Sequence, residues 1–352
     1  MLERLGRRPG AVVGLVSVAG ALVAALLGIL TFGARATVAP DGVPVAIAAP
    51  ADGRLHQVAE QVSARAGGKL DWTVTSPQQA RSQLLDKEIY GYLELTATQS
   101  GPTARVVVSG AVSPAGTRVA QTALTGVGQA LTRSFARGTE PAAMSVETLH
   151  PAGTAARTAP LALSALAWVG CLVAGALLTL LCGRAGVVAG RGMRVGQITG
   201  SAVLLTGVLA GLLALWDSTL PLDWDVLGFL ALTVAAFAAA QAGLFRLLGL
   251  RAMAILAPLY LIAPSVAGQV PELLHPAYRT LLWSWTPFRF STGTLRSLLQ
   301  GTPGAPDVAT GIWVMAGLLV AGLVVLLWPR RRSARQEAEP HASGRVVQVG
   351  VH

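Results

Sequence analysis

The sequence predicts a polytopic α-helical membrane protein with six transmembrane helices and one inserted extracytoplasmic α+β domain. Of the 352 residues, 53% are hydrophobic and only 12% are charged. The mean hydropathy is +0.57, and this composition is typical of membrane proteins. Long apolar runs recur along the chain, and a polar stretch with alternating hydrophobicity separates the first of them from the others. These observations together predict both the spans and the inserted domain.

The apolar runs have the length and composition of membrane spans. A helix needs about 20 apolar residues to cross a bilayer, and a charge at mid-helix costs about 2.5–3.5 kcal/mol. None of the runs in the central block contains Asp, Glu, Lys, Arg or His; they are Pro160–Cys182, Val195–Trp216, Val226–Phe245 and Ala252–Ala267. The first predicted span is Ala11–Phe32 and the last is Gly311–Trp328.

The first apolar run has a competing interpretation as a cleaved signal peptide. Ala34-Arg35-Ala36 resembles a small-residue cleavage site. The apolar core that precedes it is longer than the usual 7–15 residues of a signal peptide. We therefore expect an uncleaved first transmembrane helix.

The polar stretch between the first two spans reads as a compact α+β domain. Its apolar residues alternate or recur at helical spacing, and Ser76 before Pro77 is a favoured helix start. The predicted strands are Val43–Ala48, Lys69–Thr75, Ile89–Leu95, Arg105–Ser109 and Ser145–Leu149, and the predicted helices are Arg54–Ala66, Pro77–Asp86 and Gly116–Ala136. This order of elements resembles a small periplasmic porter-like module.

The chain therefore divides into seven segments. The membrane part comprises residues 11–33 (first transmembrane helix), 159–268 (helices two to five) and 311–328 (sixth helix). The other parts are residues 1–10 (cytoplasmic N-terminus), 34–158 (extracytoplasmic α+β domain), 269–310 (interfacial or re-entrant segment) and 329–352 (cytoplasmic tail).

The placement of charge predicts the orientation. The formal net charge is +10, but the basic residues lie beside the ends of apolar runs, which favours lipid headgroups over nucleic acid as their partner. The 183–194 connector is basic, whereas the 216–225 loop is acidic. The positive-inside rule then places both termini in the cytoplasm and residues 34–158 outside a cell membrane.

The segment 269–310 mixes aromatic, leucine and arginine residues. Trp283, Trp285 and Arg289 stand close together in it. Such interleaving is typical of headgroup depth, where interfacial helices lie. We expect this segment to gate the outer leaflet, with these three residues facing cargo or lipid.

No catalytic, metal or nucleotide site is recognisable in the sequence. Gly67-Gly68-Lys69 faintly resembles a phosphate loop, but Ser63 and Leu70 stand where the motif requires Gly and Ser or Thr. The cysteines, Cys171 and Cys182, lie too far apart on one helix for a disulfide. The spans also lack the ionisable relays of gradient-driven transporters. Movement of cargo would then need energy from another protein.

Two further features are candidate contact sites. Small residues that permit close approach of another helix recur in the predicted third span, at Gly196, Gly200, Gly207 and Gly211. They serve either general helix packing or a specific interface. Such an interface would be a contact with another subunit or a moving helix contact that lines the transport pathway. The 183–194 loop carries Arg184, Arg191 and Arg194, which either anchor the helix ends or dock a cytoplasmic partner.

The layout resembles the permeases of type-2 ABC exporters. The shared features are six spans, a cytoplasmic segment after the second span, and the segment Val270–Leu299 before the last one. The large domain between the first two spans is similar to that of the branch that includes the phage infection protein. The resemblance implies a homodimer, or a heterodimer with a second permease. It also implies a separate ATP-binding cassette ATPase that docks on the cytoplasmic loops and drives export of amphipathic or lipid-linked cargo.

Two other functions remain open from sequence. The first is a non-transporting envelope protein, either a receptor or a secretion-apparatus subunit, that displays the external domain. The second is a membrane-embedded enzyme, which would need a role for Asp217, Asp223 or Asp225.

Overall fold

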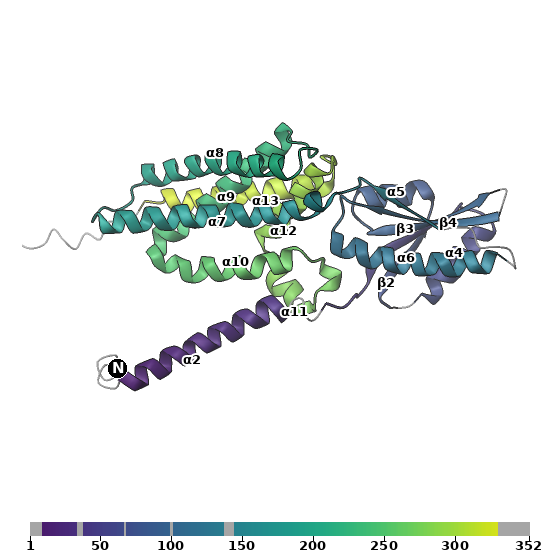
Figure 1. The fold of residues 1–352 in the computed structure, drawn as a ribbon, viewed down its shortest axis with the longest axis horizontal. Coiled ribbons are helices and arrows are strands. Elements are labelled where there is room, and N and C mark those ends of the chain that lie inside the picture. The colour runs from purple at the N-terminus through teal and green to yellow at the C-terminus, as the bar shows by residue number, and fades with distance from the viewer. Residues whose placement is uncertain (1–8, 34–37, 67, 99–100, 137–143, 330–352) are drawn as a thin grey trace, which may run out of the picture.

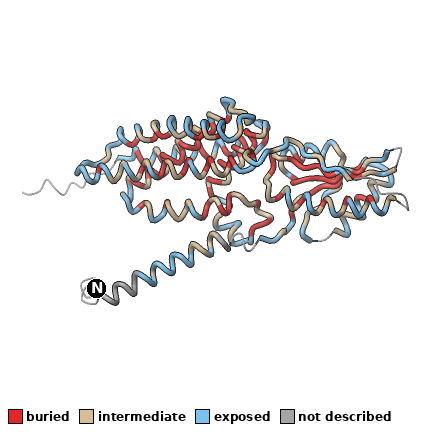
Figure 2. Tube along the Cα trace, viewed as in Figure 1, coloured by how far each residue is buried: buried red, intermediate tan, exposed pale blue. Residues whose placement is uncertain are grey.

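The computed structural model describes residues 9–33, 38–66, 68–98, 101–136 and 144–329. It has a helical bundle at one end and an α+β domain at the other, and a separate N-terminal helix slants away from the bundle (Figure 1). Buried residues concentrate in the sheet and in the centre of the bundle (Figure 2). The fold is that of a helical membrane protein with a small mixed sheet.

The α+β domain is built on a five-stranded sheet with strand order β2-β1-β3-β4-β5. β1 (Val43–Ala48) pairs in parallel with β2 (Leu70–Thr75) and β3 (Gly91–Thr98). β4 (Gly101–Ser109) pairs antiparallel with β3 and parallel with β5 (Ser145–Leu149). All five predicted strands form, and the ends of β2, β3 and β4 shift by a few residues.

Helices connect and cover the strands of this domain. They are α4 (Arg54–Arg65), α5 (Pro77–Leu85) and α6 (Pro114–Phe135). The Ser76 hydroxyl accepts a hydrogen bond from the Gln79 N–H at 3.3 Å, so the predicted start of α5 is confirmed. Ile47, Leu93 and Leu124 are fully buried in the core.

The bundle contains the membrane-like helices. They are α7 (Thr154–Arg184), α8 (Arg191–Trp216), α9 (Trp224–Leu248), α10 (Met253–Ala267) and α13 (Pro306–Leu327), with the short η2 (Gly249–Ala252) between α9 and α10. Gly249 has a φ of 58°, in the left-handed region that favours glycine, and it ends α9.

Among the described residues, four helical stretches are long and apolar enough to cross a membrane: Thr154–Arg184, Arg191–Trp216, Trp224–Ala267 and Pro306–Leu327. The third of them contains both α9 and α10, where the sequence predicted two spans. α10 has only 15 residues and two internal prolines. α2 (Pro9–Gly28) continues into η1 (Ile29–Gly33), and Gly20–Thr31, which crosses from α2 into η1, is a shorter apolar helical segment. The structure thus supports the membrane-helix class rather than the count of six.

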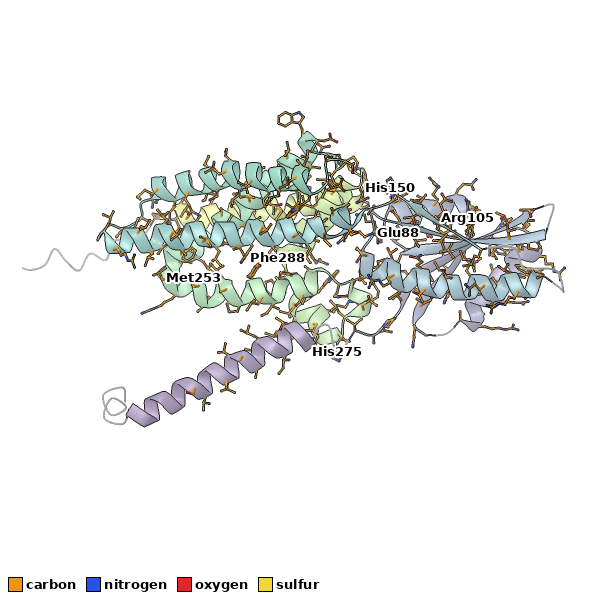
Figure 3. The ribbon with its side chains drawn as sticks, in the orientation of Figure 1. Glu88, Arg105, His150, Met253, His275 and Phe288 are labelled. Carbon is orange, nitrogen blue, oxygen red and sulfur yellow. The ribbon has the colours of Figure 1, made fainter. Side chains whose placement is uncertain are left out.

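The segment that precedes α13 folds back into the bundle. It contains η3 (Pro271–Leu273), α11 (Pro276–Tyr278), η4 (Arg279–Trp283) and α12 (Pro287–Leu299). The Phe288 ring is fully buried between Trp168 and Phe237, with centroid distances of 5.3 and 5.4 Å, and Figure 3 shows it inside the bundle. α12 is therefore a packed helix of the bundle rather than a surface helix.

Candidate functional site

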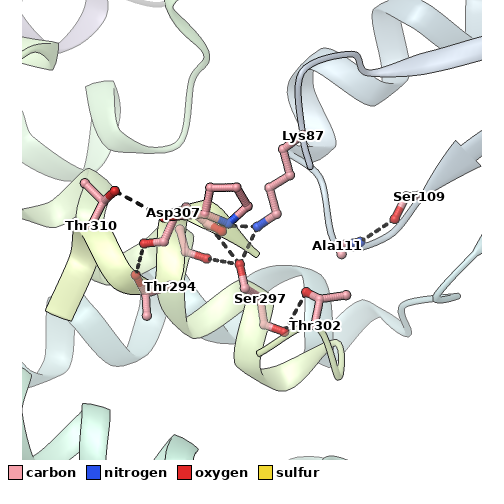
Figure 4. Close-up of polar contacts among 10 residues, drawn as sticks. Lys87, Ser109, Ala111, Thr294, Ser297, Thr302, Asp307 and Thr310 are labelled. Atoms are coloured by element: carbon pink, nitrogen blue, oxygen red, sulfur yellow. Dashed lines mark hydrogen bonds and ion pairs between the residues drawn. The ribbon is translucent and has the colours of Figure 1, made fainter. Parts of the chain in front are cut away.

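The most prominent polar cluster of the described chain lies where the α+β domain meets the bundle. The Lys87 ammonium donates a hydrogen bond to the Asp307 carboxylate at 2.7 Å and another to the Ser297 hydroxyl. The Ser297 hydroxyl also donates to the same carboxylate, at 2.8 Å. Figure 4 shows Lys87 reaching from the domain to both partners. The cluster joins the α+β domain to two consecutive helices, α12 and α13, which lie more than 200 residues further along the chain.

Local structure places each member of this cluster. Lys87 follows α5 in the left-handed region, with a φ of 64° that residues other than glycine rarely adopt. Asp307 lies in the first turn of α13, directly after Pro306, where a negative charge interacts favourably with the helix dipole. The Thr294 hydroxyl donates to the Asp307 backbone carbonyl at 3.0 Å and fixes α12 against this turn.

The electrostatics of Lys87 reflect its partly buried position. Its side chain is 17% exposed. Burial lowers the pKa of the Lys87 ammonium, the charge and hydrogen bond of Asp307 raise it again in part, and the nearby Arg296 lowers it. Because the desolvation effect is the largest, Asp307 does not fully offset the cost of placing this charge here.

A cavity of about 410 Å³ opens beside the cluster. Its charged lining consists of Lys87, Arg289, Arg296 and Asp307, and Trp283 and Phe290 form part of its apolar wall. The Arg289 guanidinium lies 3.9 Å from the Trp283 ring centroid and 4.1 Å from that of Phe290. The cavity therefore combines positive charge with aromatic surface, which suits an anion that carries an apolar part.

Of the three predicted outer-leaflet residues, the structure brings two together. Trp283 and Arg289 are in direct contact at this cavity. Trp285 is 53% exposed, is not among the lining residues, and its indole N–H donates to the Leu281 carbonyl. No sequence pattern predicted that Lys87, Arg296 and Asp307 belong to this site. Of these three residues, only Asp307 had a local sequence signal, because an acid directly after a proline is typical of the first turn of a helix.

At the other end of the bundle, arginines bind the end of α13. Arg191 donates to the Trp328 carbonyl at 3.3 Å, and Arg246 donates to the carbonyls of Val325, Leu326 and Trp328. These contacts satisfy carbonyls that a helix C-terminus leaves without intrahelical partners.

The three arginines of the predicted coupling loop thus have different positions. Arg184 is exposed at the end of α7, and Arg191 caps α13. Arg194 is only 6% exposed and donates to the Ala242 carbonyl at 3.4 Å. The position of Arg184 suits docking of another protein, and that of Arg194 suits helix packing.

The predicted glycine pairs of α8 make no close contact within the chain. A Cβ added at Gly196, Gly200, Gly207 or Gly211 would meet no described atom within 4 Å. The close helix crossing lies elsewhere. A Cβ at Gly322 of α13 would lie 2.6 Å from Ala240 N and 2.7 Å from Ala239 O of α9. Sequence spacing gave no signal for this crossing.

Other chemistry has no support in the described residues. No group of three or more His, Cys, Asp or Glu residues there has the arrangement of a metal site. Cys171 and Cys182 are both free thiols. Comparison of the chain with protein-family models, curated proteins and solved structures gives no match in any of the three. The function is therefore inferred from the geometry of this chain.

Proposed function

We propose that this chain is the permease subunit of an ATP-driven exporter of the type-2 ABC class, energised by a separate ATPase and moving amphipathic or lipid-linked cargo out of the cell. The observation that carries the proposal is α12. Its first residues pack in the bundle around Phe288, and its last turn reaches the α+β domain through Ser297. A helix that returns into the bundle before the last span is the feature that the family resemblance implies.

The distribution of charge also supports the proposal. The central turns of α7, α8, α9, α10 and α13 contain no Asp, Glu, Lys, Arg or His. Protons or sodium ions moving through these helices would lack the usual ionisable relays. An ATPase docked at the bundle end would supply the energy instead.

The proposed orientation follows from the two ends of the bundle. The end of α7, the start of α8 and the end of α9 lie away from the α+β domain (Figure 1), and they carry Arg184, Arg191 and Arg246. The positive-inside rule makes that end cytoplasmic. Residues 34–158 would then be extracytoplasmic, both termini cytoplasmic, and the chain a multi-pass protein of the cell membrane.

The proposed assembly is a homodimer, or a heterodimer with a second permease. The support is the outward face of α8, where open space surrounds the four glycines and Val203 and Leu204 are 68% and 71% exposed. Small residues on such a face let the helix of another subunit approach closely in lipid.

The test is affinity capture of the full chain from its host in mild detergent. We expect an ATPase with Walker motifs to co-purify, and its ATP hydrolysis to change when this chain is present. Arg184→Gln should reduce the capture several-fold, whereas Arg133→Gln, the same change at an exposed site on α6, should leave it unchanged. Absence of any ATPase, or gradient-driven transport by the pure chain, would overturn the proposal.

The alternative, a non-transporting envelope protein, is favoured by a groove on the α+β domain. This groove, of about 520 Å³, lies beside the edge strand β2 and is lined by Trp72, Val119 and Val127 among others. A receptor or secretion-apparatus subunit would bind its partner there. In that case Trp72→Ala would abolish function in the full chain, whereas Arg184→Gln would not.

A further inference from the structure

The junction cavity has more positive than negative charge. Lys87, Arg289 and Arg296 line it, and Asp307 is the one carboxylate among its described lining residues. Glu272 lies nearby and accepts a hydrogen bond from the Tyr90 hydroxyl at 2.9 Å. Even with both acids counted, one positive charge remains in excess.

The two arginines are also short of hydrogen-bond acceptors. The Nε atoms of Arg289 and Arg296 are inaccessible to solvent and have no hydrogen-bond partner among the described residues. Aromatic rings attract the Arg289 charge but are not conventional acceptors of its N–H hydrogen bonds. Buried donors normally have partners, so each of these guanidinium groups has hydrogen-bonding capacity that the described residues do not use.

The backbone of α12 sets the spacing of these arginines. Arg289, Gly293 and Arg296 are four and three residues apart, on one face of the helix. The rise of an α-helix separates the two arginine Cα atoms by about 10 Å. All three residues line the cavity, and a Cβ added at Gly293 would lie 3.5 Å from the Asp307 carboxylate.

We propose that this cavity binds the phosphate group of an amphipathic anion, with Arg289 and Arg296 as its hydrogen-bond donors and Trp283 and Phe290 against its apolar part. Guanidinium groups match phosphate oxygens in geometry and charge. Lys87, held by Asp307, adds to the positive potential. The phosphate belongs either to a membrane lipid headgroup or to a free phosphate ester. The site goes beyond the proposed export activity and does not depend on it, since binding needs no ATPase.

The experiment measures lipid binding to the delipidated, purified full chain by native mass spectrometry. Phosphatidylglycerol and phosphatidylcholine are titrated in separate arms, and inorganic phosphate is added as a competitor. We expect one phosphatidylglycerol to bind at least tenfold more tightly than phosphatidylcholine, because the choline cation is repelled by the cavity. Competition by inorganic phosphate would show that a phosphate group alone is sufficient for binding. Absence of competition would show that binding needs the phosphate to be carried by a lipid. Both outcomes support the site.

Charge-removing variants locate the binding. In the double variant Arg289→Gln/Arg296→Gln, affinity for phosphatidylglycerol should fall about ten- to a hundredfold, as expected for lost charge-assisted hydrogen bonds. The matched control is Arg279→Gln, an exposed arginine of the same segment that does not line the cavity; its affinity should stay within about twofold of the unmodified chain.

A second variant tests the cavity without removing charge. Gly293→Leu keeps both arginines and places a bulky side chain in the cavity wall beside the Asp307 carboxylate. It should weaken binding as much as the double variant does. If the double variant fails to fold, Gly293→Leu decides whether the cavity is the binding site. The proposal is overturned if phosphatidylglycerol and phosphatidylcholine bind equally, if both cavity variants bind normally, or if Arg279→Gln weakens binding as much as they do.

Discussion

The crossing of α9 and α13 predicts opposite effects for the same substitution at two positions of one helix. Gly322→Ala would place a methyl group 2.6 Å from Ala240 N and 2.7 Å from Ala239 O. Both atoms belong to the backbone of α9, so no side-chain rotation can relieve the overlap. The two helices must separate by up to about 1 Å to restore ordinary contact distances, and such overpacking costs about 1–3 kcal/mol.

Gly317→Ala is the matched control. Gly317 lies on the same helix, and a Cβ there meets no described atom within 4 Å. Both substitutions gain the higher helix propensity of alanine, up to about 1 kcal/mol. The difference between the two variants therefore isolates the crossing. We expect Gly322→Ala to be about 1–3 kcal/mol less stable than Gly317→Ala.

The assay is reversible unfolding of the purified chain in mixed micelles, titrated with a denaturing detergent and followed by tryptophan fluorescence. Equal stabilities for the two variants, within about 0.5 kcal/mol, would refute the crossing. A loss in Gly317→Ala alone would show that the outer face of α13 is packed instead.

Three further predictions concern the junction and the bundle core. Asp307→Asn should lower the free energy of unfolding by about 1–2 kcal/mol, because it leaves the Lys87 charge beside Arg296 without a counter-ion, and Lys87→Met/Asp307→Asn should recover most of the loss in the same assay. The pKa of the Tyr90 hydroxyl is raised by burial and by Glu272, so the folded protein keeps this proton when the unfolded chain loses it near pH 10. Stability should then fall by about 1.4 kcal/mol per pH unit above that pH, and unfolding measured between pH 9 and 11 should show a shallower fall in Tyr90→Phe. Phe288→Ala should cost about 3–5 kcal/mol by emptying the space between Trp168 and Phe237, with a change in tryptophan emission; an unchanged melting temperature would contradict the placement of α12.

Elements with local signals could be predicted from the sequence. A short apolar run predicts β1 at Val43–Ala48, a mixed polar and apolar stretch predicts β5 at Ser145–Leu149, and Ser76 before Pro77 predicts the start of α5. These signals act within a few residues of the chain. The membrane class follows in the same way from the length of the apolar runs.

Long-range contacts had no such signal. Lys87 and Asp307 are 220 residues apart, and nothing local to either residue predicts their pairing. Small-residue spacing shows which helix faces permit close approach, but it does not show which helix approaches. For that reason it selected the open face of α8 and missed Gly322, whose contact depends on where α9 crosses α13.

The α+β domain and residues 269–299 form one packing unit, which determines how they can move. Val270 and Leu273 complete the hydrophobic core of the domain, although they lie in the segment that leads to α12. Backbone N–H groups of Ala39 and Asp41 donate to the carbonyls of Leu273 and Glu272, at 3.3 and 3.0 Å.

Lys87 provides a second attachment, at the far end of α12. A displacement of the domain relative to the bundle must therefore pull on both ends of the segment that carries Arg289 and Arg296. Because these arginines line the junction cavity, such a displacement would change the cavity directly, and occupancy of the cavity would in turn bias the position of the domain.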